Sequence, residues 1–174
     1  ADGDLKWAMA GRSETKLESV RAALGEGTSG IQLITADAAD ENALREMCGK
    51  SRVIISTVGP YALYGSGLVR VCAETGTDYL DLTGEAQWIL RMLQAHESQA
   101  EKSGARIIHC CGFDSVPSDL GVYHHQKTAL EKFGEPEKQI RMQVARMKGA
   151  ASGGTVASII NIAKEMTKNP AMRK

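Results

Sequence analysis

Residues 53–61 read Val-Ile-Ile-Ser-Thr-Val-Gly-Pro-Tyr, and this stretch decides the fold class. Its first six residues form a β-branched run that is typical of a strand. The Gly-Pro pair then ends the strand, because both residues favour turns and proline cannot donate to a strand ladder. A helical pattern follows at about 67–75 and ends at a glycine. This part of the chain therefore predicts a strand, a turn and a helix in succession.

The same alternation repeats along most of the chain. Strands are predicted at 5–10, 31–36, 79–82 and 106–110, and helices at 13–24, from residue 40, and at 85–103, 120–133 and 155–168. Strands separated by helices of this length indicate βαβ units and a mostly parallel sheet. We therefore predict an α/β protein with a Rossmann-like, doubly wound sheet.

The segment 139–147 differs from the other predicted strands. It alternates apolar and polar residues, as a strand with one solvated face does. We expect a second, α+β domain to begin here and place the boundary near residue 135. The predicted domains are a dinucleotide-binding domain over 1–135 and the beginning of the second domain over 136–174.

Composition excludes several classes of protein. Lys plus Arg and Asp plus Glu each number 21, so the net charge is zero and a nucleic-acid-binding protein is not expected. No window approaches the roughly 18 apolar residues that a membrane span needs. The 4 cysteines are too few for a disulfide framework and lack the spacing of zinc ligands. We expect no metal site and a cytoplasmic location.

In doubly wound folds, ligands bind at the carboxyl ends of the strands. The first predicted strand leads into Gly11-Arg12-Ser13. An arginine there can pair with the 2′-phosphate of NADP, whereas NAD is usually held by an acidic residue. The alternative for Arg12 and Ser13 is a solvated arginine beside a helix-capping serine. After the second strand, Asp37 can bind an adenine amino group or can stand in a plain turn.

The loop after the third strand contains Thr57, Val58, Gly59, Pro60 and Tyr61, and it has the features of a ligand-binding loop. Glycine lets the backbone approach a ligand closely, and proline fixes the turn. The alternative is a tight turn from strand to helix, with tyrosines packed at the surface.

Carboxylates follow the fourth and fifth strands. Asp81 and Glu85 are close enough in sequence for acid–base chemistry if they are desolvated. The alternative is that Thr83 caps the next helix and Glu85 favours its positive end. Asp114 and Asp119 are candidates for contact with a substrate, although Asp119 can also act as a helix cap.

Four blocks occur in a fixed order along the chain. They are Ala-Gly-Arg-Ser at 10–13, Val-Gly-Pro-Tyr at 58–61, Asp-Tyr-Leu-Asp-Leu-Thr-Gly-Glu at 78–85 and Gly-Phe-Asp-Ser-Val-Pro-Ser-Asp-Leu-Gly at 112–121. Together they resemble the saccharopine dehydrogenase-like oxidoreductases, including the trans-acting enoyl reductase type. The Gly-Pro-Tyr, Thr-Gly-Glu and Gly-Phe-Asp-Ser blocks in this order are far more specific than a single glycine motif.

The resemblance implies an NADP-binding Rossmann domain, with NAD as the other possible cofactor, followed by an α+β substrate and dimerisation domain and hence a homodimer. By position it implies that the cofactor-binding residues are Gly11, Arg12, Ser13, Asp37, Thr57, Val58, Gly59 and Pro60. It places Glu85 and Ser115 on the substrate side, and we interpret Asp114 and Tyr61 as the candidates for proton transfer.

One departure from the family pattern concerns the phosphate site. The family opens with a strand and a Gly-x-x-Gly-x-x-Gly turn that holds the pyrophosphate at a helix N-terminus, and nothing of that kind precedes Arg12. In the usual strand order the missing strand is central, so the strands at 5–10 and 53–58 would each expose an edge. We expect the sequence to be a fragment that binds a dinucleotide poorly.

The function that we predict is hydride transfer between NADP and a C=N, C=O or C=C bond of a small-molecule substrate. The loops of the predicted site carry few positive side chains, so saccharopine with its several carboxylates is not the expected substrate. A lipid-like substrate fits these loops better. The alternative is a non-catalytic, NADPH-sensing regulator or scaffold that resembles the NmrA type.

Overall fold

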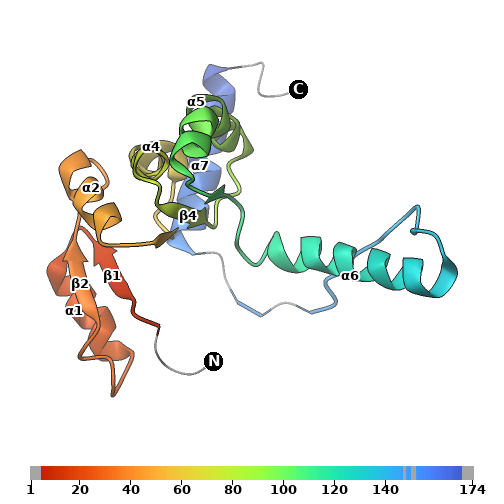
Figure 1. The fold of residues 1–174 in the computed structure, drawn as a ribbon, viewed down its shortest axis with the longest axis horizontal. Coiled ribbons are helices and arrows are strands. Elements are labelled where there is room, and N and C mark those ends of the chain that lie inside the picture. The colour runs from red at the N-terminus through yellow and green to blue at the C-terminus, as the bar shows by residue number, and fades with distance from the viewer. Residues whose placement is uncertain (1–4, 147, 150–151, 170–174) are drawn as a thin grey trace.

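The computed structural model describes residues 5–146, 148–149 and 152–169 (Figure 1). Strands and helices alternate along these residues, which confirms the predicted α/β, Rossmann-like fold. In chain order the elements are β1 (Ala8–Gly11), α1 (Glu14–Ala23), β2 (Gln32–Thr35), α2 (Glu41–Gly49), β3 (Val53–Ser56), α3 (Tyr61–Tyr64), α4 (Ser66–Thr75), β4 (Asp78–Asp81), α5 (Ala86–Ser103), β5 (Ile107–Ile108), α6 (Val116–Phe133) and α7 (Gly153–Lys168).

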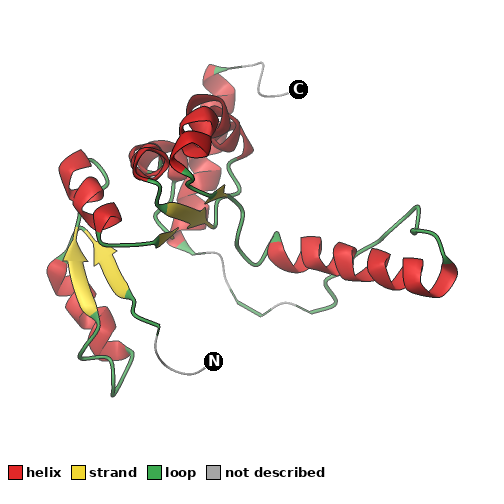
Figure 2. Cartoon of the chain, in the orientation of Figure 1, coloured by secondary structure: helices red, strands yellow, loops and turns green. Residues whose placement is uncertain are grey.

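The strands form two separate parallel sheets (Figure 2). One sheet pairs β1 with β2, and the other has the order β3-β4-β5. β1 and β3 each keep one edge that pairs with no strand in the described part of the chain. Ile55 on β3 is 68% exposed. The exposed edges that the sequence predicted are therefore confirmed.

The hydrophobic core lies between the β3-β4-β5 sheet and the helices α2, α4 and α5. Helix α4 is its centre, because Val69, Val71 and Cys72 on this helix are almost completely buried. Burial of one such aliphatic side chain contributes about 1.5–3 kcal/mol. Trp88 on α5 is also part of the core and packs against Tyr61, with 5.5 Å between the ring centroids.

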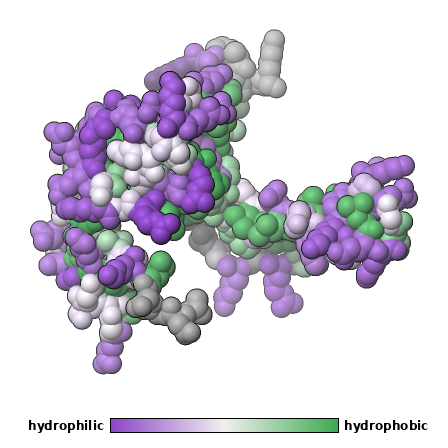
Figure 3. All heavy atoms as spheres, in the orientation of Figure 1, coloured by the Kyte–Doolittle hydropathy of each residue, from purple (hydrophilic) through white to green (hydrophobic). Residues whose placement is uncertain are grey.

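Helices α6 and α7 lie outside this core. Helix α6 projects away from the two sheets as an arm (Figure 1), and Ala129 is its one buried residue. Apolar surface is visible along this arm (Figure 3), where Leu120 and Tyr123 are exposed. Helix α7 returns to the β3-β4-β5 half, where its Ser158 donates a hydrogen bond to Glu85.

The strand expected at 139–147 is wrong. Residues 139–146 form no strand, and Met147 lies outside the described residues. An alternating pattern describes one solvated face, but a strand also needs a hydrogen-bonding neighbour, and this segment finds none in the described structure. Helix α6 also begins at Val116, before the expected start at 120, because Pro117 is well suited to the first turn of a helix.

Gly65, at the end of α3, lies so close to Trp88 on α5 that the site has no room for a side chain. A Cβ atom added to Gly65 would lie 2.8 Å from Cζ2 of Trp88 and 2.9 Å from the carbonyl oxygen of Tyr61. We expect Gly65→Ala to lower the free energy of unfolding by about 1–3 kcal/mol, because an added methyl group overpacks this contact. Urea denaturation measures the change.

The matched control is Gly121→Ala in α6, where no atom lies within 4 Å of the added Cβ. This variant should gain up to about 1 kcal/mol from the higher helix propensity of alanine. An equal loss of stability in both variants would contradict the packing argument.

Candidate functional site

In each of the two sheets the strands are parallel, so the loops that follow them lie at one edge. The first sheet places two of the predicted loops together. Gly11 pairs with Thr35, and Arg12 and Asp37 therefore follow neighbouring strands. The N–H of Ala36 donates to the carbonyl of Gly11 at 3.0 Å and joins the two loops.

Ser13 and Asp37 both have local roles in this part of the structure. The hydroxyl of Ser13 caps α1 and accepts a hydrogen bond from the N–H of Lys16 at 3.4 Å. The carboxylate of Asp37 accepts from the N–H of Ala39 at 2.9 Å, which makes a local turn. The second oxygen of Asp37 stays open to solvent on this exposed side chain.

Arg12 has no such role. Its side chain is exposed and makes no hydrogen bond or ion pair with any residue that the structure describes. Arg12 directly precedes Ser13, the N-cap residue of α1, and at such a helix N-terminus backbone N–H groups and the helix dipole favour an anion. A free guanidinium beside such amides is a donor set for a phosphate group, so these residues fit the 2′-phosphate of NADP.

The loop after β3 combines an open part with a buried part. Thr57 and Val58 are exposed, Gly59 is half-buried, and Pro60 is buried. The peptide bond between Gly59 and Pro60 is cis. The side chains of Thr57 and Val58 are open to a ligand, although the N–H of Val58 donates to the hydroxyl of Ser56 at 3.5 Å. The buried proline leads into α3.

The hydroxyl of Tyr61 makes hydrogen bonds at the ends of two strands, β3 and β4. The hydroxyl donates to the carbonyl of Ser56 at 3.0 Å and accepts from the N–H of Leu82 at 3.3 Å. The ring is 6% exposed, and burial raises the pKa of this phenol. Tyr61 therefore joins the carboxyl ends of β3 and β4.

Glu85 is 1% exposed, and both of its carboxylate oxygens accept hydrogen bonds. One oxygen accepts from the N–H of Tyr61 at 2.8 Å and from the hydroxyl of Ser158 at 2.9 Å. The other accepts from the N–H of Ala62 at 3.0 Å. Pro60 at the start of α3 offers no capping side chain, and Glu85, which follows β4 in the chain, caps this helix instead.

A hydrogen-bonded pair of Asp81 and His109 lies at the ends of β4 and β5. Asp81 is completely buried, and its Oδ2 lies 2.6 Å from Nδ1 of His109. Its Oδ1 accepts from the N–H groups of Thr83 and Cys110, both at 3.1 Å. Sequence reasoning did not find this pair, since it grouped Asp81 with Glu85. The signal was the strand register, because Tyr79 pairs with Ile107 and the two partners follow two residues later.

The last predicted residues lie in the loop between β5 and α6. Asp114 is exposed, and its side chain bonds to no residue in the described ranges. Ser115 is half-buried and precedes the first residue of α6. This loop packs on the loop after β4, because the N–H of Cys111 donates to the carbonyl of Asp81 at 2.7 Å.

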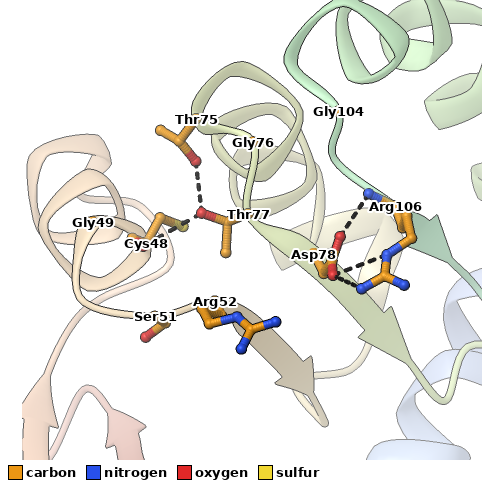
Figure 4. Close-up of a pocket in the computed structure, with 10 residues that line it drawn as sticks. All are labelled: Cys48, Gly49, Ser51, Arg52, Thr75, Gly76, Thr77, Asp78, Gly104 and Arg106. Atoms are coloured by element: carbon orange, nitrogen blue, oxygen red, sulfur yellow. Dashed lines mark hydrogen bonds and ion pairs between the residues drawn. The ribbon is translucent and has the colours of Figure 1, made fainter.

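A cavity of about 410 Å³ lies at the other edge of this sheet, at the amino ends of the three strands (Figure 4). Arg106 points toward Asp78 there, and its backbone N–H and Nε donate to the carboxylate at 2.9 and 3.0 Å. The helices α2, α4 and α5 end beside the cavity, and their negative ends disfavour a phosphate group. The amino edge of this sheet is therefore unfavourable for the phosphates of a dinucleotide.

The described residues contain neither a metal-binding cluster nor a membrane-spanning helix. No group of three or more His, Cys, Asp or Glu side chains in the described ranges could hold a metal ion. None of the helices described is both long enough and apolar enough to cross a membrane.

Comparison with known proteins identifies the family. Residues 1–108 match the saccharopine dehydrogenase NADP binding domain, which is more than half of the chain. The protein belongs to this family, which confirms the resemblance seen in the sequence. The cofactor of the family is NADP.

Curated relatives are named as trans-acting enoyl reductases. One from Mycobacterium leprae is 50% identical over 124 residues, which is 71% of this chain and 30% of the relative. One from Mycobacterium ulcerans is 40% identical over 170 residues, which is 97% of this chain and 41% of the relative. The chain thus spans less than half the length of these relatives.

A solved structure supports the fold. Saccharopine dehydrogenase (L-Glu forming) from Saccharomyces cerevisiae superimposes with a TM-score of 0.57 and 22% identity. The match covers 75% of this chain and 26% of the yeast chain. It confirms the Rossmann-like arrangement of parallel strands and flanking helices.

The buried Asp81–His109 pair gives a prediction about stability. Asp81→Asn removes the charge that faces His109, and we expect a loss of about 3–5 kcal/mol in the free energy of unfolding. Urea denaturation measures this loss. The control is Asp37→Asn, an exposed change that asparagine accommodates in the same turn, with an effect below about 0.5 kcal/mol. Similar losses in the free energy of unfolding for the two variants would show that the buried pair does not stabilise the fold more than an exposed carboxylate does.

The Asp78–Arg106 pair gives a prediction about pH. The hydrogen bond from the Arg106 guanidinium is the main cause that lowers the pKa of Asp78 to about 2. Because this folded-state pKa is below the unfolded value of about 3.9, the pair stabilises the fold above that pH. The stabilisation is lost as the pH falls toward 2.

Carboxyl ¹³C NMR titration tests this assignment. Arg106→Gln should raise the pKa of Asp78, whereas Arg52→Gln should raise it less, because Arg52 acts only through a weaker coulombic interaction. Equal shifts in the two variants would rule out the Arg106 hydrogen bond as the main cause.

Proposed function

We propose that the protein is an NADP-dependent oxidoreductase that transfers a hydride between NADP and a double bond of a small-molecule substrate. The observation that carries this proposal is the exposed Arg12, which has no hydrogen bond or ion pair among the described residues and directly precedes the N-cap residue of α1, in a chain that belongs to an NADP-binding family. The bound dinucleotide supplies the hydride chemistry, and the protein supplies orientation and exclusion of water.

The first sheet holds the adenosine end in this proposal. Arg12 pairs with the 2′-phosphate, and the O–H of Ser13 can donate to the same group while its oxygen caps α1. The open oxygen of Asp37 can accept from the adenine amino group. Gly11 leaves the backbone at the strand end accessible, because it carries no side chain.

The loop after β3 lies on the nicotinamide side in this proposal. Thr57 and Val58 offer exposed polar and apolar surface to the ring. Gly59 permits a close approach of the backbone, and the buried Pro60 fixes where the loop turns into α3. The loop is thus anchored at one end and open at the other.

For proton transfer, the geometry favours Asp114 over Tyr61. Asp114 is exposed and its carboxyl group has no partner among the described residues, so it is free to exchange a proton with a substrate. The hydroxyl of Tyr61 already bonds to the backbone of two strands. Ser115 next to Asp114 can bind a polar group of the substrate.

We infer that the substrate carries a C=C bond and an apolar chain. Support comes from the relatives that are named trans-acting enoyl reductases. Exposed apolar side chains near the carboxyl ends of β3, β4 and β5 also favour such a substrate; they are Val58, Tyr64, Leu82 and Phe113. A homodimer and a cytoplasmic location stay predictions from the sequence.

Titration calorimetry of NADPH and NADH tests the proposal in the purified full-length protein. We expect NADPH to bind at least about tenfold more tightly, equivalent to about 1.4 kcal/mol, because Arg12 pairs with the 2′-phosphate. Arg12→Gln should abolish the preference. The control Lys16→Gln removes a nearby positive charge from the first turn of α1 and should retain the preference.

Three outcomes would contradict parts of the proposal. Equal binding of NADH would remove the role of Arg12 and leave the fold unchanged. Binding of neither nucleotide would favour a structural subunit. Binding without hydride exchange to any enoyl substrate would favour the NADPH-sensing regulator, and any such exchange would exclude it.

A further inference from the structure

The Glu85 carboxylate connects two parts of the chain that are far apart in sequence. It accepts hydrogen bonds from the N–H groups of Tyr61 and Ala62, in the first turn of α3. The same carboxylate accepts from the hydroxyl of Ser158 on α7 at 2.9 Å. The turn that follows the proposed nicotinamide loop and the helix α7 therefore share one buried partner.

A second contact links the same two parts. A Cβ atom added to Gly59 would lie 3.5 Å from Oγ of Ser158, so α7 packs directly against this glycine. An ion pair of α7 differs in kind from the Glu85 contact. Arg91 and Glu165 are 3.6 Å apart, and both side chains are partly exposed.

The Glu85 connection is sensitive to the loss of any one donor. Within the described structure Glu85 has no ion-pair partner, so hydrogen bonds alone compensate its buried charge. A buried charge that loses a donor is costly, and hydrogen bonds to charged groups are stronger than neutral ones. The hydrogen bonds of Glu85 therefore fix the position of the 59–62 turn relative to Ser158 on α7.

We propose that Glu85 is a positioning residue that couples the 59–62 turn to α7, so that occupation of the cofactor loop fixes the position of this helix. This inference rests on the proposed function, which places the nicotinamide against the same loop. Cofactor contacts that stabilise the turn with its hydrogen bonds to Glu85 also stabilise the hydrogen bond from Ser158 to Glu85. Coupling of this kind is reciprocal, so the position of α7 also affects the affinity for the cofactor.

Hydrogen–deuterium exchange with mass spectrometry tests the connection in the purified full-length protein without ligand. Ser158→Ala keeps both backbone hydrogen bonds of Glu85 and removes only the link to α7. We expect exchange in the α7 peptide to become about tenfold faster, equivalent to about 1.4 kcal/mol. Unchanged exchange in α7 would overturn the proposal.

The same experiment with saturating NADPH tests the coupling. NADPH should slow exchange in both the 59–62 turn and α7 in the unmodified protein, and only in the turn in Ser158→Ala. The matched control Glu165→Gln breaks the exposed link of α7 to Arg91 and should keep the protection of both segments. In Glu85→Gln, NADPH should no longer slow exchange in either segment. If Glu85→Gln does not fold, Ser158→Ala still tests the coupling.

The outcomes separate this inference from the proposed function. If NADPH protects neither segment of the unmodified protein, the proposed function fails. If NADPH protects the turn but leaves α7 unchanged, or protects α7 equally in Ser158→Ala, only the coupling fails.

Discussion

The need to satisfy two buried carboxylates organises the carboxyl edge of the β3-β4-β5 sheet. A buried charge is tolerated only when its oxygens accept hydrogen bonds or face a cation. Glu85 meets this need with backbone donors of α3 and the hydroxyl of Ser158, and Asp81 meets it with His109 and two backbone donors. Each carboxylate thereby fixes a loop that the strands alone would leave free, and the candidate site is built from those loops.

The sequence predicted the fold well where a pattern is local. The β-branched run at 53–58 and the alternation of strands and helices sufficed for the Rossmann-like fold, and the exposed edges of β1 and β3 followed from the strand order. The strand at 139–147 failed, because a strand depends on a neighbour that the local pattern does not contain. The Asp81–His109 pair was missed for the same reason, since it arises from the register of two strands.

Glu85 shows how far residue-level reasoning extends into the site. The sequence suggested that Glu85 favours the positive end of the following helix, α5. In the structure its carboxylate caps α3 and makes no cap on α5. The expected cap of α5 by Thr83 is wrong, because Glu85 is the N-cap residue and α5 has no side-chain cap. The hydroxyl of Thr83 accepts instead from the N–H of Glu85 at 3.1 Å, in the turn before the helix. Residue type indicated that these side chains bind near the start of a helix, and only the tertiary structure identified the partner of each group.

The two sheets make physically different contributions to cofactor binding in the proposed function. Arg12 is exposed, so its attraction for a phosphate group is screened by salt over a Debye length of about 8 Å at physiological ionic strength. The hydrogen bonds of Glu85 are buried and are screened far less. Preference between the two dinucleotides therefore depends on the medium, whereas the geometry of the turn beside the nicotinamide depends on the fold. Recognition and positioning are assigned to different halves of the molecule, and a substitution in one half need not disturb the other.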